Sequence, residues 1–122
     1  SGGELCRFAL AIKVVTSKES SKSIVFDEVD SGIGGAVSTA VGERLRKLGE
    51  DRQVLVVTHS PQVAALGKNH FIVRKKLVGN DVSIMVDTVD EQGKIHEIAR
   101  MLSGKTITSE AIEAAKKLIH NS

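Results

Sequence analysis

The chain has 122 residues, of which 41% are hydrophobic, and its 17 basic and 15 acidic side chains give a formal net charge of +2. This length predicts one domain or part of one. The net charge is too small, and aromatic residues are too few, for electrostatics or base stacking alone to indicate a nucleic-acid-binding surface. The single cysteine, Cys6, excludes an internal disulfide and fits a reducing cytoplasm, and we find no signal peptide and no apolar run near the roughly 18 residues of a membrane span.

The first predicted element is a helix that begins directly after Ser1, Gly2, Gly3 and Glu4, since apolar residues recur at helical spacing over 5–15. Backbone N–H groups at a helix N-terminus, beside two glycines without a Cβ atom, can bind an anion with the help of the helix dipole. An ordinary helix cap explains the same four residues, and a cloning remnant is a further alternative. Taken alone, these residues favour the cap.

The next predicted element is a strand, Ile24 to Phe26, that ends in carboxylates at Asp27, Glu28 and Asp30. Three apolar residues in a row predict a strand buried on both faces, as in a parallel sheet covered by helices. Ligands of open α/β sheets bind at the carboxyl ends of strands. The pattern is that of a Walker B strand, in which one Asp holds Mg²⁺ and a second carboxylate activates water. A solvated acidic turn is the alternative.

A helix over 36–48 and a second buried strand over 54–57 follow, which predicts a βαβ unit with parallel strands. The second strand ends in Thr-His-Ser-Pro, so we expect His59 at the same rim as Asp27 and Glu28, where it can hydrogen-bond a phosphate. A packed or solvated histidine is the alternative when His59 is taken alone. The apolar stripe expected on the helix is Val37, Ala40, Val41, Leu45 and Leu48.

A short helix over 62–66 precedes two more predicted strands, over 71–73 and 82–86, joined by a hairpin turn at Gly79–Asn80–Asp81. The second strand alternates, so one of its faces is expected to be wet. We interpret the basic run at 74–76 first as a solvated guard of the sheet edge, and contact with a phosphate backbone is the alternative.

The remaining sequence predicts a second turn over 90–93 and then two helices. The first helix is expected to stop at Gly104, and the second to start near Thr108 or Ser109. The residues expected to face inward are Ile95, Ile98, Ala99, Leu102, Ile112, Ala115, Leu118 and Ile119. The histidines other than His59, and Cys6, show no metal-ligand spacing and are interpreted as structural or surface residues.

Three separate signals thus come in one order, and together they resemble the C-terminal half of an ABC-type ATPase head over the whole chain. Residues 1–4 match the signature motif, 24–28 the Walker B strand, 29–35 the D-loop region and His59 the switch histidine. The resemblance implies an α/β fold with a mostly parallel sheet flanked by helices and a β-hairpin. Residues 1–122 would form the C-terminal lobe of the head, with the P-loop half absent.

Within that class the chain is similar to the SMC-like heads, and among them to the RecN family of bacterial double-strand-break repair ATPases. Residues 30–35, 58–65 and 97–104 carry this similarity. There are departures: no G-x-x-x-x-G-K-[ST] loop occurs, no leucine precedes the signature serine, and Gly34 stands where many family heads carry a D-loop aspartate. A chromosome-organising SMC head, a transporter cassette and a non-enzymatic assembly module are the alternatives.

The resemblance implies hydrolysis of ATP with Mg²⁺ between two engaged heads, and an inactive fragment when this chain is alone. Asp27 would help to hold Mg²⁺, Glu28 would activate the water and His59 would contact the γ-phosphate. The other implied nucleotide-binding positions are Ser1, Gly2, Gly3, Glu4 and Asp30. The implied partners are the N-terminal half of the same head, a second copy, and DNA through the full-length protein, with no membrane. The implied location is the bacterial cytoplasm, at the nucleoid.

Overall fold

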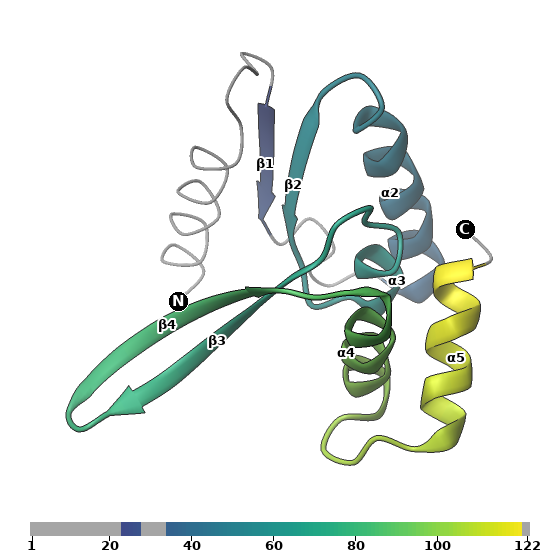
Figure 1. Ribbon diagram of the computed structural model, residues 1–122. Coiled ribbons are helices and arrows are strands. Elements are labelled where there is room, and N and C mark those ends of the chain that lie inside the picture. The colour runs from purple at the N-terminus through teal and green to yellow at the C-terminus, as the bar shows by residue number, and fades with distance from the viewer. Residues whose placement is uncertain (1–22, 28–33, 121–122) are drawn as a thin grey trace.

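This computed structural model describes residues 23–27 and 34–120, and the fold that they form is mixed α/β (Figure 1). The elements in chain order are β1 (Ser23–Asp27), α2 (Gly35–Leu48), β2 (Gln53–Val57), α3 (Pro61–Ala64), β3 (Phe71–Val78), β4 (Asp81–Thr88), α4 (Glu91–Ser103) and α5 (Ser109–His120). The predicted combination of a parallel strand pair, flanking helices and a β-hairpin is therefore confirmed.

Strands β1 and β2 form the parallel pair, with α2 as the connection between them. Their register runs from Ser23 opposite Gln53 to Asp27 opposite Val57. Every residue of both strands is only half-buried, so the prediction of strands buried on both faces was wrong for the described part of the chain. In a two-stranded sheet each strand has an open edge, and an open edge leaves the backbone and neighbouring side chains partly accessible.

Helix α2 covers the predicted apolar stripe only in part, since Val41, Leu45 and Leu48 are half-buried. Its buried residues are Ser38 and Gly42, whereas Val37 is 54% exposed and Ala40 is exposed. The reason is the close approach of α3 and the residues after it, because a methyl group placed on Gly42 would lie 3.3 Å from Val63 Cα and 2.6 Å from Leu66 Cδ1. Only the smallest side chains fit there, so steric room rather than hydrophobicity decides which face of α2 is covered.

Among the described strands, β3 and β4 pair only with each other, and they project as a long arm, which we call the hairpin arm (Figure 1). Val78 lies opposite Asp81, and the two-residue turn uses Gly79 at φ 63°, a left-handed conformation that glycine adopts without strain. Both strands are longer than predicted because the basic run continues β3. Its side chains are all exposed, and Arg74 forms an ion pair with Asp87 at 3.8 Å.

The start of α4 corrects another prediction, since residues 90–93 are not a separate turn. The side chain of Asp90 caps the helix by accepting a hydrogen bond from the backbone N–H of Gly93 at 2.8 Å, so the helix already begins at Glu91. The residues were interpreted as a turn because Asp and Gly favour both turns and caps. The predicted stop at Gly104 is correct, and this residue has a φ of 78°.

The hydrophobic core lies mainly between α4 and α5, which run side by side (Figure 1). Ile98, Ala99 and Ala115 are fully buried, and the hydroxyl of Thr108 caps α5 by accepting a hydrogen bond from Ala111 N at 3.1 Å. The core residues are Ala65, Ile95, Ile98, Ala99, Ala111 and Ala115. Small residues on facing helices allow close packing, which explains why a short α3 can join this core through Ala65.

Candidate functional site

The candidate site lies at the carboxyl ends of β1 and β2. Asp27 is the last residue of β1 and is paired with Val57, the last residue of β2. Because the strands are parallel, both chains leave the sheet at the same edge, and His59 follows Val57 by two residues. The described residues therefore bring Asp27 and His59 to one rim. Their chemical roles stay predictions.

The carboxylate of Asp27 has one oxygen in an unusual environment. Oδ1 is buried, and no hydrogen-bond partner for it occurs in the described part of the chain. Buried polar atoms are normally hydrogen-bonded, because desolvation without a partner is costly. A hard cation or its bound water would satisfy this oxygen, and Mg²⁺ is typically held by one or two carboxylates together with substrate phosphates.

No richer metal centre competes with this reading. Within residues 23–27 and 34–120, no group of three or more His, Cys, Asp or Glu side chains could hold a metal ion. A site to which the described residues contribute one carboxylate suits Mg²⁺ bound along with a nucleotide, because phosphate oxygens and waters can complete its six ligands.

The turn from Thr58 to Pro61, which we call the His59 turn, is held by its own hydrogen bonds. The backbone N–H of Ser60 donates to Thr58 Oγ1 at 2.9 Å. The hydroxyl of Ser60 caps α3 by accepting from Val63 N at 3.4 Å, and Pro61 occupies the first turn of that helix. His59 is exposed between these fixed neighbours. Its imidazole can therefore meet a ligand without unfolding the turn.

Helix α2 begins near this turn, at the end of the segment that carries the other predicted carboxylates. Gly34 is its N-cap residue, and no side-chain cap is seen there among the described residues. A methyl group placed on Gly35 would lie 3.5 Å from Gln62 Nε2, so the side chain of Gln62 faces the first residue of α2. The start of α2 thus lies beside α3, the helix that follows the His59 turn.

Most of the predicted nucleotide-binding residues cannot be placed. Ser1, Gly2, Gly3, Glu4, Glu28 and Asp30 lie outside the described residues. The predicted helix over 5–15 also lies outside them. The described part of the site therefore consists of Asp27, the His59 turn and the start of α2.

Sequence reasoning missed a charged cluster at the base of the hairpin arm. The side chain of Glu97 is only 13% exposed and accepts two hydrogen bonds from Arg100, at 2.9 Å from Nε and 2.6 Å from Nη2. The hydrogen bond from Arg100 is the main cause that lowers the pKa of Glu97. The spacing of three residues within a helix is the signal that could have revealed the pair.

His70 belongs to the same cluster and precedes β3. Burial lowers the pKa of His70, and the positive charge of Lys94 lowers it further, while Glu97 acts in the opposite direction. The ammonium group of Lys94 donates to the carbonyl of Gly67 at 2.6 Å, which ties α4 to the loop before the arm. The cluster fixes the base of the arm and contains no feature that points to catalysis.

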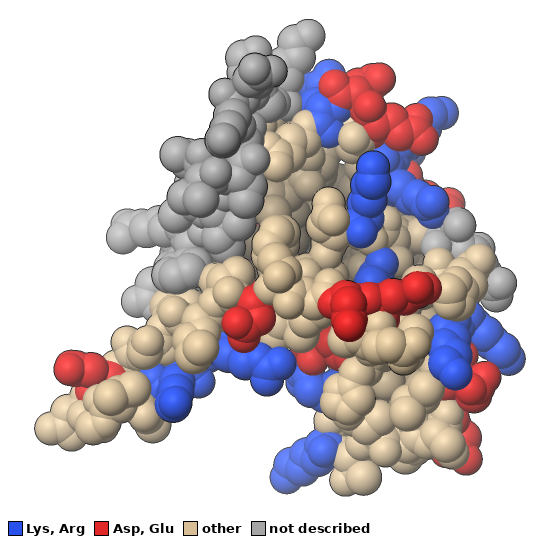
Figure 2. Space-filling view, viewed as in Figure 1, with Lys and Arg blue, Asp and Glu red and all other residues tan. Residues whose placement is uncertain are grey.

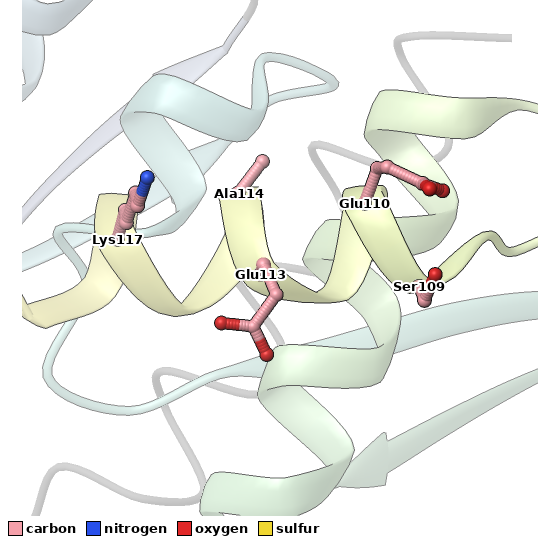
Figure 3. Close-up of a pocket in the computed structure, with 5 residues that line it drawn as sticks. All are labelled: Ser109, Glu110, Glu113, Ala114 and Lys117. Carbon is pink, nitrogen blue, oxygen red and sulfur yellow. The ribbon is translucent and has the colours of Figure 1, made fainter.

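A shallow hollow on the outer face of α5 is a weaker candidate (Figure 3). Its lining side chains all come from that one helix, and the close-up shows them spread along it with no convergent polar groups. Binding sites usually combine an apolar cavity with polar groups that converge on one point. The hollow therefore does not compete with the rim at Asp27.

Comparison with protein-family models gives no match for this chain. Among individual proteins, it is 46% identical over 121 residues to the DNA repair protein RecN of Rickettsia felis and 49% identical over 120 residues to RecN of Xylella fastidiosa strain Temecula1. RecN of Vibrio cholerae is 45% identical over 120 residues. Each alignment covers 98% of this chain but 22% of the relative, so the chain spans about a fifth of these relatives' length.

A solved structure gives independent support for the fold. The matched protein comes from work on ATP-driven dimerization and DNA-stimulated activation of SMC ATPases. The superposition has a TM-score of 0.52 at 18% sequence identity, and it covers 87% of this chain and 63% of that chain. At this identity the match concerns the fold alone.

Proposed function

We propose that the chain is a RecN-type segment, because it is 46% and 49% identical to parts of two RecN DNA repair proteins, and that residues 1–122 form the C-terminal lobe of an ATP-hydrolysing head. In the complete head, an N-terminal half supplies the P-loop that this sequence lacks. The observation that carries the proposal is the buried oxygen of Asp27, which has no partner among the described residues and lies on the rim that β1 shares with the His59 turn.

In this proposal, ATP provides the phosphoryl group, and Mg²⁺ would neutralise the negative charge of the phosphates. Asp27 would hold the cation through the oxygen that has no partner among the described residues, and the exposed imidazole of His59 would donate a hydrogen bond to the γ-phosphate. Glu28 orients or deprotonates the attacking water. The residues proposed to contact nucleotide from the two engaged heads are Ser1, Gly2, Gly3, Glu4 and Asp30.

The N-terminal half of the same head is the first proposed partner, and the hairpin arm is the surface that it covers. Alternation along β3 and β4 puts Val73, Leu77, Val82, Ile84 and Val86 on one face of the arm. Leu77 is 75% exposed and Val82 is 60% exposed, although they lie opposite each other. An isolated two-stranded hairpin is marginally stable in water, and an exposed apolar patch of this kind indicates a partner.

In a RecN-type protein, the proposed N-terminal half would belong to the same polypeptide as this segment. The chain spans 22% of the relatives' length, so most of such a protein lies outside this segment. Covering the apolar face with the rest of the head would also provide the neighbours that the open edges of the two small sheets lack.

A second head and DNA are the other proposed partners, and the proposed location is the bacterial cytoplasm at the nucleoid. The names of the relatives support DNA repair, and the structural neighbour is described by ATP-driven dimerization and DNA stimulation. On the face seen in Figure 2, basic and acidic side chains are interspersed, so we assign DNA contact to the full-length protein. The described helices include none that is long and apolar enough to cross a membrane.

The test is steady-state ATP hydrolysis by this chain alone and by the chain co-expressed with the N-terminal half, each with and without DNA. We expect no turnover by the chain alone and turnover by the two halves together. Stimulation by DNA supports a repair function. If the two halves bind each other and still do not hydrolyse ATP, the proposal is wrong and an assembly module is the better interpretation.

A further inference from the structure

The side chain of Gln62 lies between the His59 turn and the start of α2. It is the second residue of α3, and its Oε1 accepts a hydrogen bond from the hydroxyl of Ser60 at 3.0 Å. The other end of the amide faces α2, because a methyl group placed on Gly35 would lie 3.5 Å from Nε2. One side chain therefore forms a hydrogen bond within the His59 turn and faces the start of α2.

The backbone of Gln62 is held in place independently of this side chain. Where α2 and α3 cross, a methyl group on Gly42 would lie 3.3 Å from Val63 Cα and 3.6 Å from the carbonyl oxygen of Gln62. Ser38, one turn earlier on α2, is 3% exposed. The two helices thus meet almost backbone to backbone, and a close-packed contact of this kind resists displacement.

The hydrogen bond to Gln62 also sets the orientation of the Ser60 hydroxyl. That hydroxyl donates its proton to Gln62 and accepts from Val63 N, while the Ser60 N–H donates to Thr58 Oγ1. His59 lies between Thr58 and Ser60 in the chain, so the hydrogen bonds of both neighbours fix its backbone. Without the amide of Gln62, the hydroxyl of Ser60 loses its acceptor and can rotate away from the cap.

We propose that Gln62 is a positioning residue, which holds the His59 turn in register with the start of α2. The inference rests on the proposed ATPase function, because it assigns Gln62 to the placement of His59 at the rim that carries Asp27. Gln62 acts through these neighbours and does not itself touch the nucleotide. Misplacing a group near the reacting atoms affects turnover more than affinity.

The experiment uses the full-length protein that carries this segment, with variants Gln62→Ala and Gln62→Glu. Gln62→Ala should lower kcat by about 10-fold or more while the KM for ATP stays within about twofold. Gln62→Glu keeps an acceptor for the Ser60 hydroxyl and should recover part of the loss. The matched control is Gln92→Ala, a glutamine exposed in the first turn of α4, which should leave kcat unchanged.

A double-mutant cycle with Ser60→Ala separates positioning from general destabilisation. If Gln62 acts through Ser60, the double variant should have about the same kcat as whichever single variant has the lower kcat. Losses that multiply, or a kcat loss in Gln62→Ala that Gln62→Glu does not reduce at all, would overturn the inference. Thermal unfolding of each variant identifies any loss that comes from misfolding, and Gln62→Glu then decides.

The same experiment distinguishes this inference from the proposed function. If the wild-type full-length protein does not hydrolyse ATP, the proposed function is wrong, and the positioning role fails with it. If the wild-type protein is active and Gln62→Ala matches it in both kcat and KM, only the positioning role is wrong.

Discussion

The hairpin arm allows the sharpest quantitative prediction. Burying a whole Val or Leu side chain contributes about 1.5–3 kcal/mol. Because Leu77 is 75% exposed and Val82 is 60% exposed, covering both should contribute about 2–4 kcal/mol to association with the N-terminal half. The double variant Leu77→Ser/Val82→Ser should therefore bind that half about 30- to 700-fold more weakly.

The assay is the dissociation constant of the two purified halves, measured by calorimetry. Val78→Ser is a matched control on the same strand, since Val78 is 59% exposed but lies on the opposite face of the arm. It should bind nearly as well as the wild-type chain. Equal binding by the double variant and the wild type, or an equal loss in Val78→Ser, would refute the assignment of this face as the docking surface.

Three further predictions concern other parts of the molecule. Glu28→Gln in the complete head should lower ATP turnover by about 10²–10⁴-fold and leave ATP binding intact, as measured by steady-state kinetics and nucleotide titration. Burial lowers the pKa of His70 below its ordinary 6.5, so the unfolded chain takes up the proton first. The free energy of unfolding should be highest above pH 6.5 and should fall as the pH drops from 6.5 through the lowered pKa of folded His70. In His70→Gln, the urea concentration at the unfolding midpoint should change less between pH 7 and pH 5 than it does in the wild type. Gly42→Val should lower the free energy of unfolding by about 1–3 kcal/mol, because its added carbons meet Leu66, whereas Ala40→Val on the exposed side of α2 should change it little in urea titrations.

Local patterns predicted the parts of the fold that depend on neighbours in the sequence. The strand before Asp27, the helix after Gly35 and the strand before His59 all follow from runs of apolar residues and glycine stops. The parallel pairing of the two strands follows from the helix between them. These elements were enough to predict that Asp27 and His59 share one rim.

Features that depend on contacts between elements were predicted less well. The buried face of α2 is set by the close approach of α3 at Gly42, which no periodicity in α2 reveals. The hydrogen bond between Ser60 and Gln62 and its contact with Gly35 likewise join residues on separate elements. At Asp90, turn and cap chemistry are so similar that only the hydrogen bond to Gly93 decides between them.

The length of the arm was underestimated for a different reason. If β3 were a buried strand, the charged residues at 74–76 would mark its end. Because both faces of the hairpin arm are exposed at these positions, charged side chains can point to either face without burial. A strand can therefore continue through a basic run wherever the surrounding chain does not cover it.

The central claim is that the buried oxygen of Asp27 serves Mg²⁺ in a nucleotide site, and the Mg²⁺ dependence of ATP binding tests it most directly. The measurement compares the wild-type complete head with Asp27→Asn, by titrating Mg²⁺ at fixed ATP and following bound nucleotide by fluorescence. We expect the variant to need at least about tenfold more Mg²⁺, because an amide is a weaker ligand for this ion than a carboxylate, and to bind metal-free ATP as the wild type does. Identical Mg²⁺ dependence in the two proteins would contradict the account.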